Sequence, residues 1–169
     1  MPETTPLIER IVLDLVTALE AIVEGDSVTD IFGTTMDPFQ ISVGEVIRPK
    51  RIGLDYAPTQ DYSIVVLQGG SAPEPDSDSV AGAARRQSVS LDLYAQISDM
   101  ATTAVDTKIN LFAAEVVKAI MADPQRSGLA YNSEIGEFQY IDGGDAIQGV
   151  TIMYDVIHRT PEADPYTKA

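Results

Sequence analysis

The sequence predicts an α+β fold: a mostly antiparallel sheet of about four strands, with two amphipathic helices packed on one face. Two patterns support this prediction. Apolar residues recur at steps of three and four over 7–24 and 99–123, which indicates helices. Shorter segments alternate apolar and polar residues, which indicates strands with one buried face. With 169 residues, 44% of them hydrophobic, the chain has the size and composition of a single domain, 1–169.

The two predicted helices have recognisable ends. Thr5 is expected to cap the first helix, with Pro6 at the first helical position, where its missing N–H is not needed. Gly25 follows the apolar stripe and is expected to end this helix. The second helix stops before Pro124, because proline cannot continue a helix.

Extended structure is predicted for the segments 39–51, 61–68, 85–98, 134–141 and 146–158. The clearest is 85–98, in which every second residue is apolar: Val89, Leu91, Leu93, Ala95 and Ile97. Its other face carries Ser, Tyr and Gln, so this side of the sheet is a candidate interface. In 39–51 the alternation breaks at Gly44, which indicates a bulge.

Two segments lack any periodicity. The stretch GGSAPEPDSDSVAG begins at Gly69, and it predicts a flexible hairpin loop over 69–83, longer than ordinary hairpin loops. Residues 159–169 are polar and contain two prolines, which predicts an extended C-terminal tail. Such a tail either frays or adds to the sheet edge or groove of a neighbouring molecule.

The charge balance excludes several classes of protein. The chain has 11 Lys and Arg against 26 Asp and Glu, a formal charge of −15. A surface this acidic does not neutralise phosphates, so nucleic-acid binding and attachment to anionic membranes are not expected. No run approaches 18 apolar residues, so no membrane span is predicted. The N-terminus lacks the basic start of a signal peptide, which favours a cytoplasmic origin.

The sequence gives little support for catalysis. There is no cysteine, hence no thiolate ligand, cysteine nucleophile or disulfide. The single histidine, His158, has no G-x-S-x-G serine to activate and is expected to bond locally at a strand end. The chain has neither a P-loop nor a G-x-G-x-x-G turn between a strand and a helix. We therefore expect no enzyme activity and no cofactor.

Alternating carboxylates suggest calcium, but the spacing does not fit. Glu74, Asp76 and Asp78 alternate like the first ligands of an EF-hand loop. Counted from Asp76, the sixth position needs glycine and holds Ala81, and the twelfth needs glutamate and holds Gln87. No metal site is therefore predicted. The Asp-Gly-Gly-Asp sequence at 142–145 is ordinary turn chemistry.

Basic residues gather in two places, at Arg48, Lys50 and Arg51 and at Arg85 and Arg86. In so acidic a chain they are expected either to pair with a neighbouring subunit or to serve as charges that keep strand edges apart. Pairing of the second cluster with Asp76 or Asp78 of the same chain is a further alternative. The residues predicted at an interface are Arg48, Arg51, Glu74, Asp76, Asp78, Arg85, Arg86, Asp164 and Tyr166.

The layout of the chain resembles the tail-terminator (tail-completion, or minor tail) proteins of long-tailed bacteriophages. The matching features begin with the first helix, which contains Leu15 and Leu19, the basic strand with Arg48-Pro49, and the strand around Val65. They continue with the long polar hairpin loop, the long strand with Tyr94, and the second helix, which is closed by Asp123-Pro124. The final hairpin contains Tyr154 and runs into Arg159-Thr160 and Asp164-Pro165-Tyr166. The likeness covers most of the chain and lies in the order of elements.

The resemblance implies a structural virion protein, assembled in the host cytoplasm, that forms a ring, usually a hexamer. In that family the ring caps the head-proximal end of the tail tube, ends its polymerisation and offers a surface to the head connector. The implied partners are further copies of the chain, the tail-tube protein and the connector or neck protein. DNA would pass through the lumen without specific binding, since carboxylates repel phosphates. The alternatives are a tail-tube or head-completion (neck) protein and an acidic protein-binding module.

Overall fold

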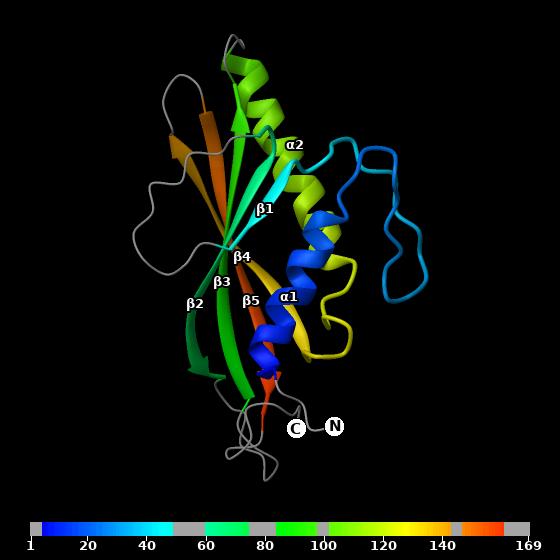
Figure 1. Ribbon diagram of the computed structural model, residues 1–169, viewed down its shortest axis with the longest axis vertical. Coiled ribbons are helices and arrows are strands. Elements are labelled where there is room, and N and C mark those ends of the chain that lie inside the picture. The colour runs from blue at the N-terminus through cyan, green and yellow to red at the C-terminus, as the bar shows by residue number, and fades with distance from the viewer. Residues whose placement is uncertain (1–4, 49–59, 75–83, 98–101, 143–146, 161–169) are drawn as a thin grey trace.

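The described residues form an α+β fold, with a five-stranded sheet and two helices. The computed structural model describes residues 5–48, 60–74, 84–97, 102–142 and 147–160. The elements in chain order are α1 (Leu7–Glu20), β1 (Glu45–Ile47), β2 (Ser63–Pro73), β3 (Ala84–Gln96), α2 (Thr102–Met121), β4 (Asn132–Asp142) and β5 (Ile147–Arg159). The strand order is β1-β2-β3-β5-β4, and both helices lie on one side of the sheet (Figure 1). Within these ranges, no helix is both long and apolar enough to cross a membrane.

The face of the sheet beneath the helices forms the core. Val89, Leu91, Leu93 and Ala95 of β3 are all buried, which confirms the predicted alternation in that strand. The matching residues of β5 and of the α1 stripe are buried against them: Val150, Ile152, Tyr154, Val156, Leu7, Ile11, Val12, Leu15 and Leu19. Complete burial of one such aliphatic side chain is worth about 1.5–3 kcal/mol, so this layer holds the helices on the sheet.

The sheet differs from the prediction at its first edge. It is mixed, because β1 runs parallel to β2 with Val46 opposite Ile64, whereas about four antiparallel strands were expected. Of the predicted strand 39–51, residues 39–48 are described, and only three of these, Glu45–Ile47, join the sheet. The preceding Phe39 and Ile41 are buried in a connecting segment instead. The Phe39 carbonyl accepts a hydrogen bond from the Gly25 amide at 2.9 Å, so this stretch of backbone bonds to the segment that follows α1.

Gly44 does not form the predicted bulge, because it lies before β1. A Cβ atom at this position would approach the Asp61 carbonyl oxygen to 2.6 Å. The Gly44 amide donates to the Tyr62 carbonyl at 3.1 Å. Glycine is therefore required here for close passage of two backbones, one leading into β1 and one into β2.

The ends of α1 also differ from the prediction. Pro6 is the N-cap residue and no side chain caps the helix, so the predicted role of Thr5 is wrong. The helix ends at Glu20, and Gly25, with φ of +88°, belongs to the following turn. The second helix, Thr102–Met121, lies within the predicted range and ends before Pro124 as expected.

The hairpin between β2 and β3 is longer than predicted, because residues 69–73 belong to β2. A register shift between Gln68 and Ser71 accommodates the two glycines. Here the Gln87 side-chain amide donates to the carbonyls of Gly69 and Gly70, at 2.9 and 3.2 Å. A buried side chain thus stabilises the irregular part of the strand. The rest of the predicted loop, 75–83, lies outside the described residues.

A buried arginine holds the end of α2. Arg126 lies in a turn with φ of +49°, and its side chain is almost completely buried. Its guanidinium donates to the carbonyls of Ile120 and Asp123, which closes the C-terminal end of the helix. A guanidinium nitrogen lies 3.6 Å from the Asp14 carboxylate of α1, so the same side chain also links the two helices.

Candidate protein–protein interface

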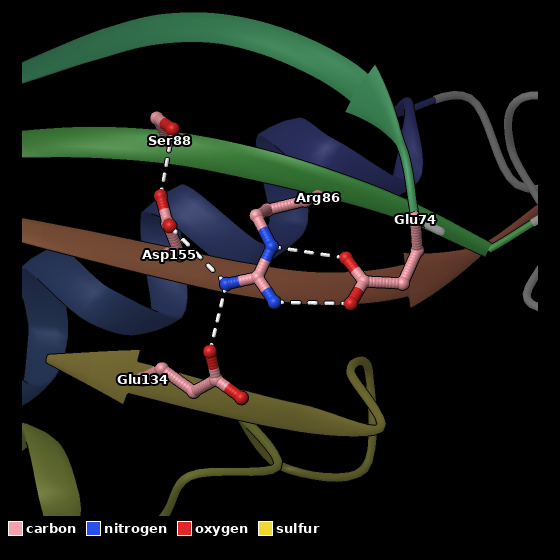
Figure 2. A network of polar contacts seen from close by, with 5 residues as sticks. All are labelled: Glu74, Arg86, Ser88, Glu134 and Asp155. Carbon is pink, nitrogen blue, oxygen red and sulfur yellow. Dashed lines mark hydrogen bonds and ion pairs between the residues drawn. The ribbon is translucent and has the colours of Figure 1, made fainter. Parts of the chain in front are cut away.

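The polar face of the sheet centres on Arg86, which lies on β3 and points away from the helices (Figure 2). Its Nε and Nη2 atoms donate to both oxygens of Glu74, at 2.9 and 3.0 Å. Its Nη1 atom donates to Glu134 of β4 at 2.7 Å and to Asp155 of β5 at 3.2 Å. Ser88 donates to the other oxygen of Asp155 at 2.6 Å. One guanidinium thus joins β3 to β4, β5 and the residue that follows β2.

The electrostatics of this cluster favour the charged arginine. The hydrogen bonds that Arg86 donates to Glu74, and then to Glu134, raise its pKa above the ordinary value. One positive charge faces three negative charges, so the cluster keeps an excess of two negative charges. Of the alternatives for Arg86, the structure shows pairing within the chain, with Glu74, Glu134 and Asp155. The predicted partners Asp76 and Asp78 lie outside the described residues.

A second polar group continues along the same face. Asp92 accepts hydrogen bonds from Ser90 at 3.0 Å and from Thr151 at 2.7 Å. The side chains of this face are therefore bonded to one another across β3 and β5. Such a surface is hydrophilic, and its side chains satisfy one another's hydrogen-bonding groups.

Arg48 is also paired within the chain, at a different place. It follows β1, and its two Nη atoms donate to the two carboxylate oxygens of Glu9 on α1, at 2.6 and 3.0 Å. This bidentate contact lowers the pKa of Glu9. The structure therefore brings Glu74 and Arg86 together and leaves Arg48 in a separate contact. Of the other predicted interface residues, Arg51, Asp76, Asp78, Asp164 and Tyr166 lie outside the described residues.

Arg85 and His158 are neighbours at the opposite end of the β3–β5 pair from Tyr94 and Gly149. Arg85 donates from Nε to the Ser71 hydroxyl at 3.0 Å. His158 is buried, and neither ring nitrogen has a hydrogen-bond partner in the part of the chain that the structure describes. The expectation of a local bond at this strand end is therefore wrong. Burial, and then the nearby Arg85 charge, lower the pKa of the imidazole.

The exposed half of β4 was not identified from the sequence. β4 is an edge strand that pairs with β5 alone among the described strands. Residues 136–140 are exposed on both faces, and Phe138 and Tyr140 keep 43% and 69% of their surface accessible. They lie opposite Ile152 and Val150, on the side of the sheet that carries the helices. The Tyr140 hydroxyl donates to Asn110 of α2 at 2.7 Å. We call residues 136–140 the β4 patch.

A second exposed aromatic lies in the long connection between α1 and β1. Phe32 has 86% of its surface accessible, the largest value among the exposed apolar side chains of the described ranges. It sits in a tight turn closed by a bridge between Thr29 and Thr35. We call residues 29–35 the Phe32 turn. The sequence pattern predicted a loop here, but no periodicity shows whether a phenylalanine in a loop points inward or outward.

Comparisons with known proteins add no assignment: no protein-family model matches the chain, and no curated protein matches its sequence. In the described ranges, no three His, Cys, Asp or Glu side chains are placed so that they could hold a metal ion.

Proposed function

We propose that this chain is a structural virion protein of a long-tailed bacteriophage, a tail terminator. In this role it forms a ring, expected to be a hexamer, that caps the head-proximal end of the tail tube. The ring ends polymerisation of the tube and joins the tail to the head connector. The role needs no catalytic residue and no cofactor.

The observation that carries the proposal is the exposed half of β4. A sheet edge with two exposed aromatic residues is a surface suited to contact with another protein. The α+β layout and the order of its elements agree with the resemblance drawn from the sequence. A contact between this edge and a different surface of the next copy is heterologous. Such contacts form a closed ring when the rotation between successive copies brings the last copy back to the first.

The charge of the chain supports the same role. A ring of subunits that each carry −15 has a lumen in which carboxylates repel DNA phosphates, so DNA passes without adhering. The part of the predicted loop that follows β2, 74–83, is proposed to contact the tube or line the lumen. The tail, with Asp164 and Tyr166, is proposed to contact a neighbouring subunit.

The test is electron microscopy of the purified protein, combined with mass measurement in solution. Closed rings with a central hole support a terminator, whereas open tubes of growing length favour a tail-tube protein. Deletion of the gene from its phage gives a second measurement. Overlong tubes without heads are expected, whereas tails of normal length joined to heads would rule out the role. A stable monomer that binds a basic protein, together with normal tails, would favour the acidic binding module.

A further inference from the structure

We infer that two copies of this chain join by placing the Phe32 turn of one copy against the β4 patch of the next. This inference rests on the proposed function, because it names the contact from which the ring is built. It assigns each copy one protruding element and one receiving surface. Three features support this contact: the rigidity of the turn, the positions of the two elements beside α2, and the distribution of charge.

The Phe32 turn is held in one conformation by its own hydrogen bonds. One carboxylate oxygen of Asp30 accepts from the Phe32 and Thr34 amides, at 2.9 and 2.8 Å. The Gly33 amide donates to the Asp30 carbonyl at 3.0 Å, and Gly33 adopts φ of +84°, a value that glycine tolerates best. Because the turn is ordered before contact, little conformational entropy is lost when Phe32 is buried by a partner.

The turn is fixed to one end of α2 and the β4 patch lies beside the middle of the same helix. The Ile31 amide donates to the Ala122 carbonyl at 3.1 Å, just beyond the last residue of α2. Tyr140 of the patch bonds to Asn110. Twelve residues separate these two anchor points, which is about 18 Å along a helix. In Figure 1 the connection that contains the turn extends beyond the helices, on the side away from the sheet. A rigid turn placed there does not reach the β4 patch of its own chain, so a contact between the two must join different molecules.

The charge distribution identifies a second copy as the occupant. Two chains that each carry −15 repel one another, so a contact between them must avoid carboxylates. Residues 31–36 and 138–141 contain no charged side chain. The one carboxylate of the β4 patch, Glu137, accepts a hydrogen bond at 3.2 Å from Gln139, which lies opposite Thr151 and so on the other face of the sheet from Phe138 and Tyr140. The one carboxylate inside the turn, Asp30, is occupied by two backbone amides. A basic partner would instead be attracted to acidic surfaces such as the Arg86 cluster, which keeps an excess of negative charge.

The test uses the absence of native cysteine, because every disulfide formed is then an introduced one. Two single variants, Phe32→Cys and Tyr140→Cys, are mixed in equal amounts at a concentration where the protein associates and are oxidised mildly. Each substitution removes an aromatic side chain and weakens the contact, but oxidation traps every pair that forms, so crosslinked pairs with one copy of each variant are expected to accumulate above the control. The matched control replaces Phe32→Cys with Leu13→Cys, a position 46% exposed on α1, and should give only the collisional background.

A second measurement tests how much Phe32 contributes to the strength of self-association. Phe32→Ala is expected to weaken self-association by roughly tenfold or more, as measured by sedimentation, because a central aromatic anchor is lost. Leu13→Ala should leave association unchanged. Thermal unfolding that matches the unsubstituted protein shows that the fold is intact.

Three results would overturn the inference: a monomer at every concentration, crosslinking no stronger than in the Leu13 control, or unchanged association of the Phe32→Ala variant. These results are distinct from failure of the proposed function. Rings that form without the Phe32–Tyr140 crosslink leave the terminator role intact and place the contact elsewhere. Crosslinked open filaments would support the contact and contradict the terminator.

Discussion

Arg85 of β3 lies directly opposite His158 of β5, so a cation and a buried imidazole are cross-strand neighbours. Desolvation and the arginine charge both oppose protonation of the imidazole. The folded protein therefore holds His158 neutral at pH values where the unfolded chain binds a proton.

This pair predicts a loss of stability in weak acid. The pKa of His158 is lowered from 6.5 in the folded state, so its contribution is fully present above pH 6.5 and declines as the pH falls below it. Between pH 7.5 and 5.5 the cost is at most about 1.4 kcal/mol, reached if the folded state stays unprotonated. Urea unfolding at pH 7.5 and at pH 5.5 measures this loss in the free energy of unfolding. The variant His158→Phe should show a smaller difference in unfolding free energy between the two pH values. A difference equal to that of the unsubstituted protein would show that another group titrates.

Arg86 is expected to contribute more to stability than Arg48. Arg86→Ala leaves three carboxylates facing one another across the sheet, and a loss of about 1–2 kcal/mol in the free energy of unfolding is expected. Arg86→Lys should recover part of this loss, because lysine keeps the positive charge. The recovery should be incomplete, because lysine cannot reproduce the bidentate contact.

The control for that experiment is Arg48→Ala, which removes a single, part-exposed ion pair with Glu9. A loss below about 1 kcal/mol is expected there. Both variants are compared by denaturant unfolding at low and high salt. Equal losses would show that the three carboxylates around Arg86 do not act together.

Gly149 of β5 should not tolerate alanine. A Cβ atom there would lie 2.4 Å from the Leu93 carbonyl oxygen and 3.2 Å from the Tyr94 ring. Because β5 is paired on both sides, the backbone cannot move away, and Gly149→Ala is expected to cost about 2–3 kcal/mol. Gly70→Ala is the matched control, since nothing lies within 4 Å of its Cβ position, and its effect should stay within about 0.5 kcal/mol. Thermal unfolding that ranks the two variants equally would contradict this account.

The sequence predicted the features that depend on local periodicity. The alternation in β3 identified its buried face correctly, and the apolar stripes identified both helices. The turn residues at 142–145 correctly indicated a hairpin, because β4 and β5 pair antiparallel on either side of them. Each of these signals is carried by residues close together in the chain.

Features that depend on distant residues could not be predicted in this way. The parallel pairing of Val46 with Ile64 needs the two backbones to pass closely at Gly44. The pattern of apolar residues gives no indication of this close passage. The strand continues through Gly69 and Gly70 because Gln87, on another strand, bonds to their carbonyls. No local pattern indicates that the side chain of Arg126 is buried and lies beside Asp14 of α1.

The candidate interface was predicted only in part. For the basic residues the sequence left open whether they pair with a neighbouring subunit, keep strand edges apart or, in the second cluster, pair within the chain. The structure shows pairing within the chain for Arg48 and Arg86. The exposure of Phe32 and Tyr140 was missed, because no signal in the sequence distinguishes these two aromatic residues from buried ones.

The position of β5 bears on the order of events during synthesis. β5 lies between β3 and β4 and is the last strand of the described chain, so neither neighbour has its full set of hydrogen bonds until residue 159 has been made. The helices and the β2–β3 hairpin emerge first, with one long edge of β3 still open. We expect the nascent chain to stay vulnerable to aggregation and proteolysis through most of its translation, and to gain its stability almost in a single late step.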